Sequence, residues 1–203
     1  MRTSISKVAS ETVSSFQAFT KFLSKDNTQD IVLFRDQSAD WPMLPKVARI
    51  DADRPLPDAE REMLRVFKQQ SLPFLNATPS TTWDWLALAQ HYGLATRPLD
   101  WTLNPLVALW FTVRKPPKSG SNGVVWIFRP NHDDFAQEFD DPFSGDRTKV
   151  FRPNHVTDRI RVQSGYFTVH KFVGSANKFV GWLLWLGSLA GVGPRQLPEM
   201  LEQ

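Results

Sequence analysis

The chain has no cysteine among its 203 residues. This absence excludes disulfide bonds and cysteine-ligated metal sites, and it makes a reducing compartment, the cytoplasm, the expected location. Histidine is scarce as well. Three of the four histidines, His132, His155 and His170, show no spacing typical of metal ligands, so we expect no metal site.

The sequence also lacks a long uninterrupted hydrophobic run. The longest apolar stretch, FVGWLLWLGSLAGVG at 179–193, has 15 residues and four glycines, which is short of the roughly 20 residues that span a bilayer. We interpret it as buried core and expect no stable membrane insertion, with an interfacial segment anchored by Trp182 and Trp185 as the alternative. The first residues show no secretory apolar core, which agrees with a cytoplasmic protein.

Charge is unevenly distributed, although the net charge is only +3. Residues 133–146 contain six acidic and no basic side chains, whereas 147–178 contain seven basic side chains and only Asp158 as an acid. One interpretation is two solvated surfaces that partly neutralise each other. The other is an anion-binding floor for phosphate or nucleic acid, with the acidic segment as a lid or mimic. The charge pattern leaves both open.

Hydrophobic periodicity predicts a single α+β domain with a small mixed or antiparallel sheet flanked by helices. We expect a core at 30–172, a helical N-terminal segment at 8–25 and a C-terminal helical segment at 177–203. The expected helices are 10–24, 58–70, 81–92 and 104–114. The expected strands are 31–34, 99–102, GVVWIF, a short edge strand at 149–152, and 166–172, with a polar loop at 131–148.

The most informative segment is QHYGLATRPLDWTLNPLVALWF at 90–111. Asn104 and Pro105 form a helix start, and the helical spacing of Leu106, Leu109, Trp110 and Val113 predicts one buried stripe. Upstream, Arg97 and Asp100 interrupt apolar residues of a short strand. Charges beside a buried strand are costly unless they meet each other or a ligand, so this strand is a candidate site.

Each polar residue of this segment also has a structural interpretation. Thr96, Arg97 and Asp100 can form an internal polar network, and Thr102 can cap the helix with Asn104. Tyr92 shares an apolar stripe, which favours a place in the core, while its hydroxyl can still reach a pocket. His91 is either structural or functional, and in the second case it acts as a general base or forms a hydrogen bond with a ribose hydroxyl.

Several motifs together resemble the FRG domain family, named for a Phe-Arg-Gly signature. They are FRDQSADWPMLP, WLALAQHYGLATRPLDWTLNPLVALWF, GVVWIF and RIRVQSGYFTVH, which cover about residues 30 to 172. The tail LGSLAGVGPRQLPEML is similar to the C-terminal helix and turn of the family. Two departures stand out: Asp36 replaces the signature glycine, and LATRPLD replaces LPTRLLD. Because Pro98 lacks a backbone donor, its strand is expected at a sheet edge or only from Leu99.

FRG domains in turn resemble ADP-ribosyltransferases, which cleave NAD at the nicotinamide glycosidic bond. That resemblance implies an ADP-ribosyltransferase-like fold, NAD as substrate, and a carboxylate near the ribose. The segment RIRVQSGYF carries no carboxylate at the corresponding place, and no glutamate lies between Glu138 and Glu199. Catalysis would then use Asp100, Asp36 or Asp158, or the site binds without reacting.

The resemblance implies a toxin or phage-defence effector that modifies nucleic acid or protein. The alternatives are a non-catalytic module that binds nucleotide or nucleic acid, and a protein-interaction domain with a rigid polar core. The sequence does not predict an oligomeric state. Arg35 would hold pyrophosphate or ribose, and Gln163 before Gly165 would form a second wall. The candidate catalytic residues are Arg35, His91, Asp100 and Gln163, and the candidate NAD-binding residues are Arg35, Gln37, His91, Tyr92, Thr96, Arg97, Thr102 and Gly165.

Overall fold

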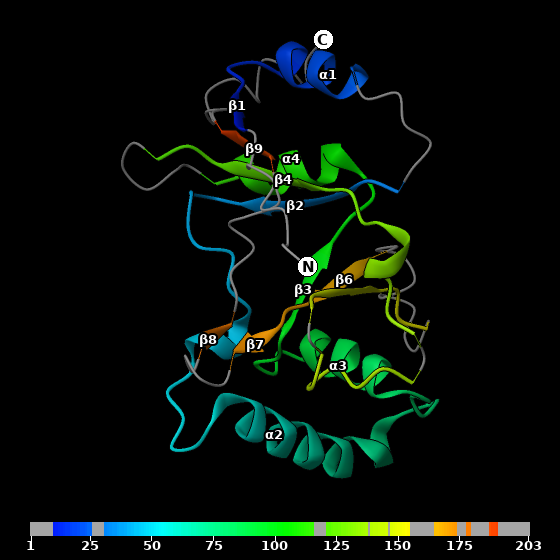
Figure 1. Cartoon of the computed structure of the whole chain (residues 1–203). Coiled ribbons are helices and arrows are strands. Elements are labelled where there is room, and N and C mark those ends of the chain that lie inside the picture. The colour runs from blue at the N-terminus through cyan, green and yellow to red at the C-terminus, as the bar shows by residue number, and fades with distance from the viewer. Residues whose placement is uncertain are drawn as a thin grey trace, which may run out of the picture. The chain divides into compact units, whose positions relative to one another are not determined.

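The computed structural model contains two compact units, which are described separately below (Figure 1). Unit 1 comprises Met1–Pro42, Thr102–Arg129 and Trp182–Gln203, and unit 2 comprises Met43–Trp101 and Pro130–Gly181. The structure describes residues 10–25, 31–115, 121–137, 139–145, 147–154, 165–173, 178–179 and 187–190.

Unit 1 is built on a four-stranded sheet. Its described elements are β1 (Ser10–Thr12), α1 (Phe16–Ser24), β2 (Leu33–Gln37), α4 (Pro105–Val113), β4 (Val124–Phe128) and β9 (Gly187–Ala190). The strand order is β1-β9-β4-β2. β4 pairs antiparallel with β2 and β9, and β1 pairs parallel with β9. Helices α1 and α4 share one hydrophobic core with β2 and β4, centred on Phe19, Phe34 and Leu109.

The N-terminal helix is shorter than predicted. Ser15 caps it by accepting a hydrogen bond from the Ala18 amide at 3.1 Å, so α1 begins at Phe16. The preceding Ser10–Thr12 segment is a strand. Strand β2 is longer than predicted and continues to Gln37, so Arg35 lies in its middle, opposite Trp126 of β4.

The predicted buried stripe of α4 is only half right. Asn104 caps the helix and Pro105 begins it, as expected. The buried side chains are Ala108, Leu109, Thr112 and Val113, whereas Leu106 and Trp110 are 47% and 48% exposed. The reason is that α4 has no charged side chain, so its sequence offers two apolar faces and periodicity alone does not identify the one that meets the sheet.

Unit 2 combines a small antiparallel sheet with two longer helices. Its strands follow the order β3-β6-β5, and a separate pair joins β7 and β8. The edge positions predicted for the Pro98 strand and the 149–152 strand are confirmed. The described elements are η1 (Lys46–Arg49), α2 (Leu56–Ser71), η2 (Leu72–Phe74), α3 (Thr82–His91), β3 (Pro98–Trp101), η3 (His132–Asp134), β5 (Lys149–Phe151), β6 (Tyr166–Val169), β7 (Phe172–Val173) and β8 (Lys178–Phe179).

Helix α3 is the central layer of unit 2 (Figure 1). One side of it packs against Leu64 of α2 through Trp85, Leu88 and neighbouring residues. The other side packs against the three-stranded sheet, where Trp83 and Ala87 meet Phe151 and Val169. All residues from Trp83 to Ala89 are consequently buried. This burial leaves the last turn of α3 in a fixed position beside β3.

The α+β class predicted from the sequence is confirmed, whereas the helical prediction for 177–203 is wrong where the structure describes that segment. Lys178–Phe179 and Gly187–Ala190 are strands, and β9 lies between β1 and β4 in the sheet of unit 1. The glycine, serine and alanine of β9 carry no helical period, and pairing with two strands decides their conformation. The single-domain organisation stays a prediction. None of the helices in the described ranges combines the length and hydropathy needed to cross a bilayer.

Helix α3 ends at a glycine whose conformation can be tested. Gly93 has a φ of 91°, and a Cβ there would meet nothing within 4 Å. The cost of Gly93→Ala is therefore purely conformational, and we expect a loss of about 1–2 kcal/mol in the free energy of unfolding, measured by urea denaturation. Gly145→Ala, also in unit 2, is the control and should change stability by less than about 0.5 kcal/mol. Equal effects of the two substitutions would contradict the assignment.

Candidate functional site

The last turn of α3 and strand β3 hold a chain of polar side chains. The amide nitrogen of Gln90 donates to the Asp100 carboxylate at 3.3 Å, and the Gln90 amide oxygen accepts from the Thr96 hydroxyl at 3.3 Å. Asp100 is exposed, whereas its neighbours Leu99 and Trp101 are buried on the other face of β3. The outcome is one exposed carboxylate with an amide fixed next to it.

Arg97 pairs with a residue of α2 that the charges on its own strand did not suggest. Its guanidinium Nε donates to Glu60 Oε2 at 2.8 Å, and its backbone amide donates to Glu60 Oε1 at 2.7 Å. Glu60 comes from α2, and both side chains are at most 1% exposed. Burial raises the pKa of the Glu60 carboxyl, and the charge and hydrogen bonds of Arg97 oppose that shift. The Glu60 carboxylate thus links the α3–β3 connection to α2, a helix that is distant in the sequence.

The same arginine also contacts the 139–145 segment. Its Nη1 donates to the Pro142 carbonyl at 2.7 Å, and its guanidinium lies 4.5 Å from the centre of the Phe143 ring. Asp141 of this segment pairs with Arg61 of α2 at 3.2 Å. Burial acts to raise the pKa of Asp141, but hydrogen bonds from Phe143 and Ser144 and the Arg61 charge outweigh it and lower that pKa. Arg97 therefore joins three separate segments of unit 2.

Trp101 belongs to the core of unit 2. Its indole nitrogen donates to the Thr168 hydroxyl at 2.9 Å, and this hydroxyl lies 3.1 Å from His170 Nε2. All three side chains are buried. The Trp101 ring is therefore not accessible to a ligand, and the same holds for the buried Trp126 of unit 1.

His91 and Tyr92 end α3 with different exposures. His91 is half-buried, and its ring meets that of Tyr92 edge to face at 5.4 Å. Tyr92 is 64% exposed, so its predicted place in the core is wrong. The cause is that α3 ends at this residue, which makes Tyr92 the C-cap rather than the next member of the stripe.

The candidates in unit 1 have structural partners. Gln37 is buried and accepts a hydrogen bond from the Trp126 indole. Thr102 accepts from the Asn104 amide at 3.1 Å and forms a two-way backbone bridge with Phe34. Arg35 is half-buried on β2. The helix amides of Leu106 and Val107 donate to Asn104 Oδ1, so the predicted cap is confirmed for Asn104, whereas Thr102 binds only the amide of Asn104 itself. A ligand role for Arg35 stays a prediction.

The second wall proposed from Gln163 and Gly165 is only partly visible. Gln163 lies outside the described residues. Gly165 is half-buried just before β6, and a Cβ there would lie 3.6 Å from the Trp101 carbonyl, an ordinary contact. Packing alone therefore does not explain a glycine at this position.

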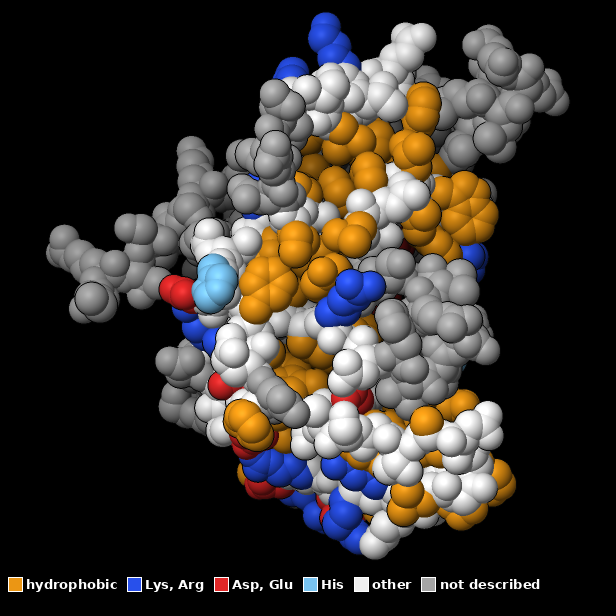
Figure 2. Space-filling view, turned by 90° about the vertical axis from the view of Figure 1, so that its right-hand side faces the viewer, with side chains coloured by type: hydrophobic (Ala, Val, Ile, Leu, Met, Phe, Trp, Pro, Cys, Tyr) orange, Lys and Arg blue, Asp and Glu red, His pale blue; other side chains and the backbone are white. Residues whose placement is uncertain are grey.

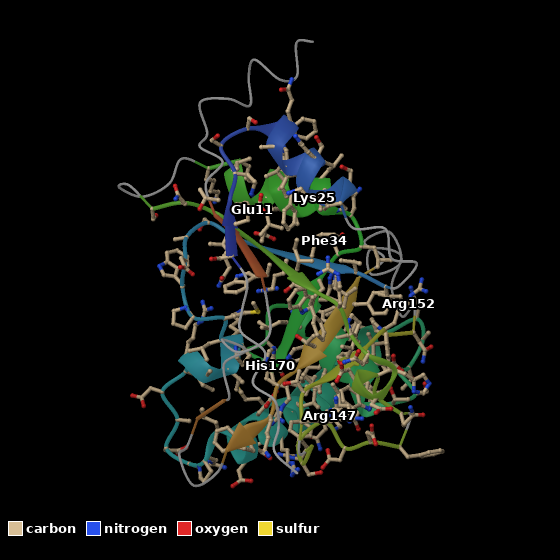
Figure 3. All side chains as sticks on the ribbon, turned by 45° about the horizontal axis from the view of Figure 1, so that its top comes forward. Glu11, Lys25, Phe34, Arg147, Arg152 and His170 are labelled. Carbon is tan, nitrogen blue, oxygen red and sulfur yellow. The ribbon has the colours of Figure 1, made fainter. Side chains whose placement is uncertain are left out.

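The basic segment is partly neutralised by the acidic one. Arg147 pairs with Asp134, and Lys149 lies 3.6 Å from Asp140. Arg147, Lys149, Asp140 and the buried His170 line a cavity of about 340 Å³. Arg147 and His170 are labelled in Figure 3. Its cations face carboxylates, which favours two mutually neutralising surfaces over an anion-binding floor. Among the residues that the structure describes, no group of three or more histidines and acids could hold a metal ion.

Comparison with known families finds a match that covers the α3–β3 segment and its polar side chains. The FRG domain model matches residues 30–121. The chain carries an FRG domain. The matched range includes Arg35, His91, Arg97 and Asp100, while the resemblance of residues 122–172 and of the tail stays a prediction. No curated protein and no solved structure matches the chain.

Two residues of the FRG domain network were missed by sequence reasoning. Gln90 stands inside the quoted motif but was not considered a candidate. Glu60 had a detectable signal, because it precedes Met63 and Phe67 by three and seven residues and therefore falls on the predicted inward face of α2. A glutamate on such a face requires a buried partner.

The Glu60–Arg97 pair can be tested by a double-mutant cycle. Glu60→Leu or Arg97→Met leaves one buried charge without its partner, and each should lower the free energy of unfolding by about 3–5 kcal/mol. The double variant should lose clearly less than the sum of the two single losses.

The control is Glu62→Leu on the same helix, which breaks the exposed Glu62–Arg65 pair. Its effect should be small because solvent screens that pair. Additive losses in the Glu60 and Arg97 cycle, measured by urea denaturation, would show that the two side chains do not interact.

Proposed function

We propose that the FRG domain of this chain is an ADP-ribosyltransferase that uses NAD, with Asp100 as its acidic group. The observation that supports this most is the exposed Asp100 carboxylate, fixed by Gln90 on a strand that the buried Glu60–Arg97 pair holds in place. Groups on rigid elements keep the geometry that catalysis needs. A carboxylate held in this way suits a reaction that develops positive charge.

Asp100 would act on the ribose that carries nicotinamide. The C1′–N bond breaks, and its electron pair leaves with nicotinamide. The ribose becomes oxocarbenium-like, and a nearby carboxylate stabilises that charge. The acceptor nucleophile then bonds to C1′, and its proton passes to the Asp100 carboxylate. We choose Asp100 over Asp36 because Asp100 is exposed whereas Asp36 is half-buried, and over Asp158 because Asp158 lies outside the matched range.

The remaining roles follow the family resemblance and are part of the same proposal. His91 and Gln163 would contact ribose hydroxyls. The acceptor would be a nucleic acid or a protein in the cytoplasm, as in a toxin or phage-defence effector. The partial neutralisation of Arg147 and Lys149 favours a protein acceptor over a nucleic acid, because nucleic-acid binding depends on cations that are available to phosphates.

A second candidate function is a non-catalytic protein-interaction module. It is favoured by the burial of Thr96 and Arg97, each 1% exposed, since the most polar part of the motif then serves the interior. In that case the polar motif stabilises the fold and has no catalytic role. The two candidates differ in whether NAD is consumed.

The test measures nicotinamide released from NAD in the presence of cell extract. Wild-type protein should release it, and Asp100→Asn should reduce the rate by about 100-fold or more, because the amide keeps the shape but not the charge. The matched control is Asp51→Asn, an exposed loop carboxylate of the same unit, which should keep the wild-type rate.

Calorimetric titration with NAD separates the remaining outcomes. Wild-type protein that neither binds nor cleaves NAD would reject the enzyme and leave the interaction module. An Asp100→Asn variant that folds normally and retains the full rate would reject the assigned role of Asp100.

A further inference from the structure

Unit 1 contains a small apolar cavity of about 210 Å³ between its helices and its sheet. Helix α1 contributes Phe22 and Leu23 to the lining, and Pro105 contributes the start of α4. Hydrophobic side chains gather at the height of α1 and the sheet of unit 1 in the space-filling view (Figure 2). Because Phe22 and Leu23 are only half-buried, the cavity can be reached from solvent.

The sheet supplies the floor of this cavity, and its register explains which side chains lie there. Phe34 of β2 is paired with Ile127 of β4, and both side chains line the cavity. Side chains alternate between the two faces of a strand, so Val32 and Arg129 fall on the same face, two residues outward from this pair. Both of them also line the cavity. The floor is therefore apolar and ends at a guanidinium group.

The charge at the cavity is positive. Arg129 is the one charged residue among the described residues that line it, and its side chain is exposed. The cavity also reaches Pro105, the first residue of α4, and a helix carries partial positive charge at its N-terminus. Lys25, which follows α1, lies 3.9 Å from Glu11, so its charge is partly compensated. An anionic group is therefore best placed at Arg129.

We propose that this cavity binds a medium-chain fatty acid, with the hydrocarbon chain between α1 and the sheet and the carboxylate at Arg129. Water gains few hydrogen bonds between apolar side chains, so a hydrocarbon chain is the better occupant. A guanidinium group can bind a carboxylate through two parallel hydrogen bonds. The inference is independent of the NAD chemistry proposed for Asp100.

The volume of the cavity sets the length of the chain. An apolar cavity of about 150 Å³ holds benzene, so one of about 210 Å³ holds roughly eight carbons in proportion. Octanoate has this size. We expect it to bind with a dissociation constant on the order of 0.1 mM, which is typical of a small ligand with one apolar part and one charged group.

The first test is calorimetric titration of the full chain with carboxylates of increasing length. Each buried methylene should strengthen binding by about fourfold, so octanoate should bind about 15-fold more tightly than hexanoate. Decanoate should gain less per methylene than octanoate does, because its last carbons exceed the volume of the cavity.

The second test separates the charge from the hydrocarbon chain. Octanol should bind about three- to fivefold more weakly than octanoate, because solvent screens the charge of the exposed Arg129. Arg129→Gln should weaken octanoate binding by the same factor and leave octanol binding unchanged. The matched control is Lys21→Gln, which removes an exposed charge of α1 outside the lining and should change neither affinity.

The third test locates the ligand. Val32→Phe fills the cavity from the start of β2 and should abolish octanoate binding. Val107→Phe makes the same substitution at an exposed position of α4 outside the lining, and it should bind octanoate like the wild type. Circular dichroism checks that both variants fold. In the wild type, octanoate should shift the methyl resonances of Leu23 and Ile127, which locates the site even if Val32→Phe does not fold.

Four results would overturn the proposal. Wild-type protein that binds no octanoate at about 5 mM, well above the expected dissociation constant, would show that the cavity takes no fatty acid. Equal affinities for hexanoate and octanoate would place the ligand on the surface. An Arg129→Gln variant with wild-type affinity for octanoate would remove the assigned anion site. A folded Val32→Phe variant that binds octanoate like the wild type would place the ligand elsewhere.

Discussion

The buried ion pair between Glu60 and Arg97 is the interaction on which unit 2 depends. One carboxylate from α2 receives both the guanidinium and the backbone amide of Arg97, while the same guanidinium binds the Pro142 carbonyl. Two charges are removed from water here, which is expensive unless they are well paired and hydrogen-bonded. The pair therefore fixes the connection between α3 and β3.

The Glu60–Arg97 pair explains why polar residues are buried between α3 and β3, where the surrounding residues are apolar. Thr96 and Arg97 are buried, and alternation along β3 then turns Asp100 outward beside Gln90. A rigid interior and one exposed carboxylate thus arise from the same short stretch. The FRG domain match includes this stretch. Asp100, the proposed acidic group, therefore lies on a packed strand rather than on a loop.

The sequence predicted most helices because caps and periodicity are local signals, as at Asn104. The sequence-based predictions were wrong where contacts with distant segments determine the conformation or the buried face. The apolar sequence of α4 fits the sheet with either face, and β9 is a strand because two strands flank it. The candidate strand was recognised from the costly charges, but the partner of Arg97 lies 37 residues away. Only the inward position of Glu60 on α2 hinted at it.

Hydrogen exchange at the backbone amide of Arg97 tests the central claim most directly. This amide donates to a buried carboxylate outside any strand ladder, so its protection reports the pair itself. The account predicts exchange only through unfolding of the whole unit, with an opening free energy equal to that of the most protected amides of α3. Exchange at a rate near that of exposed loop amides would show that the pair does not hold the α3–β3 connection.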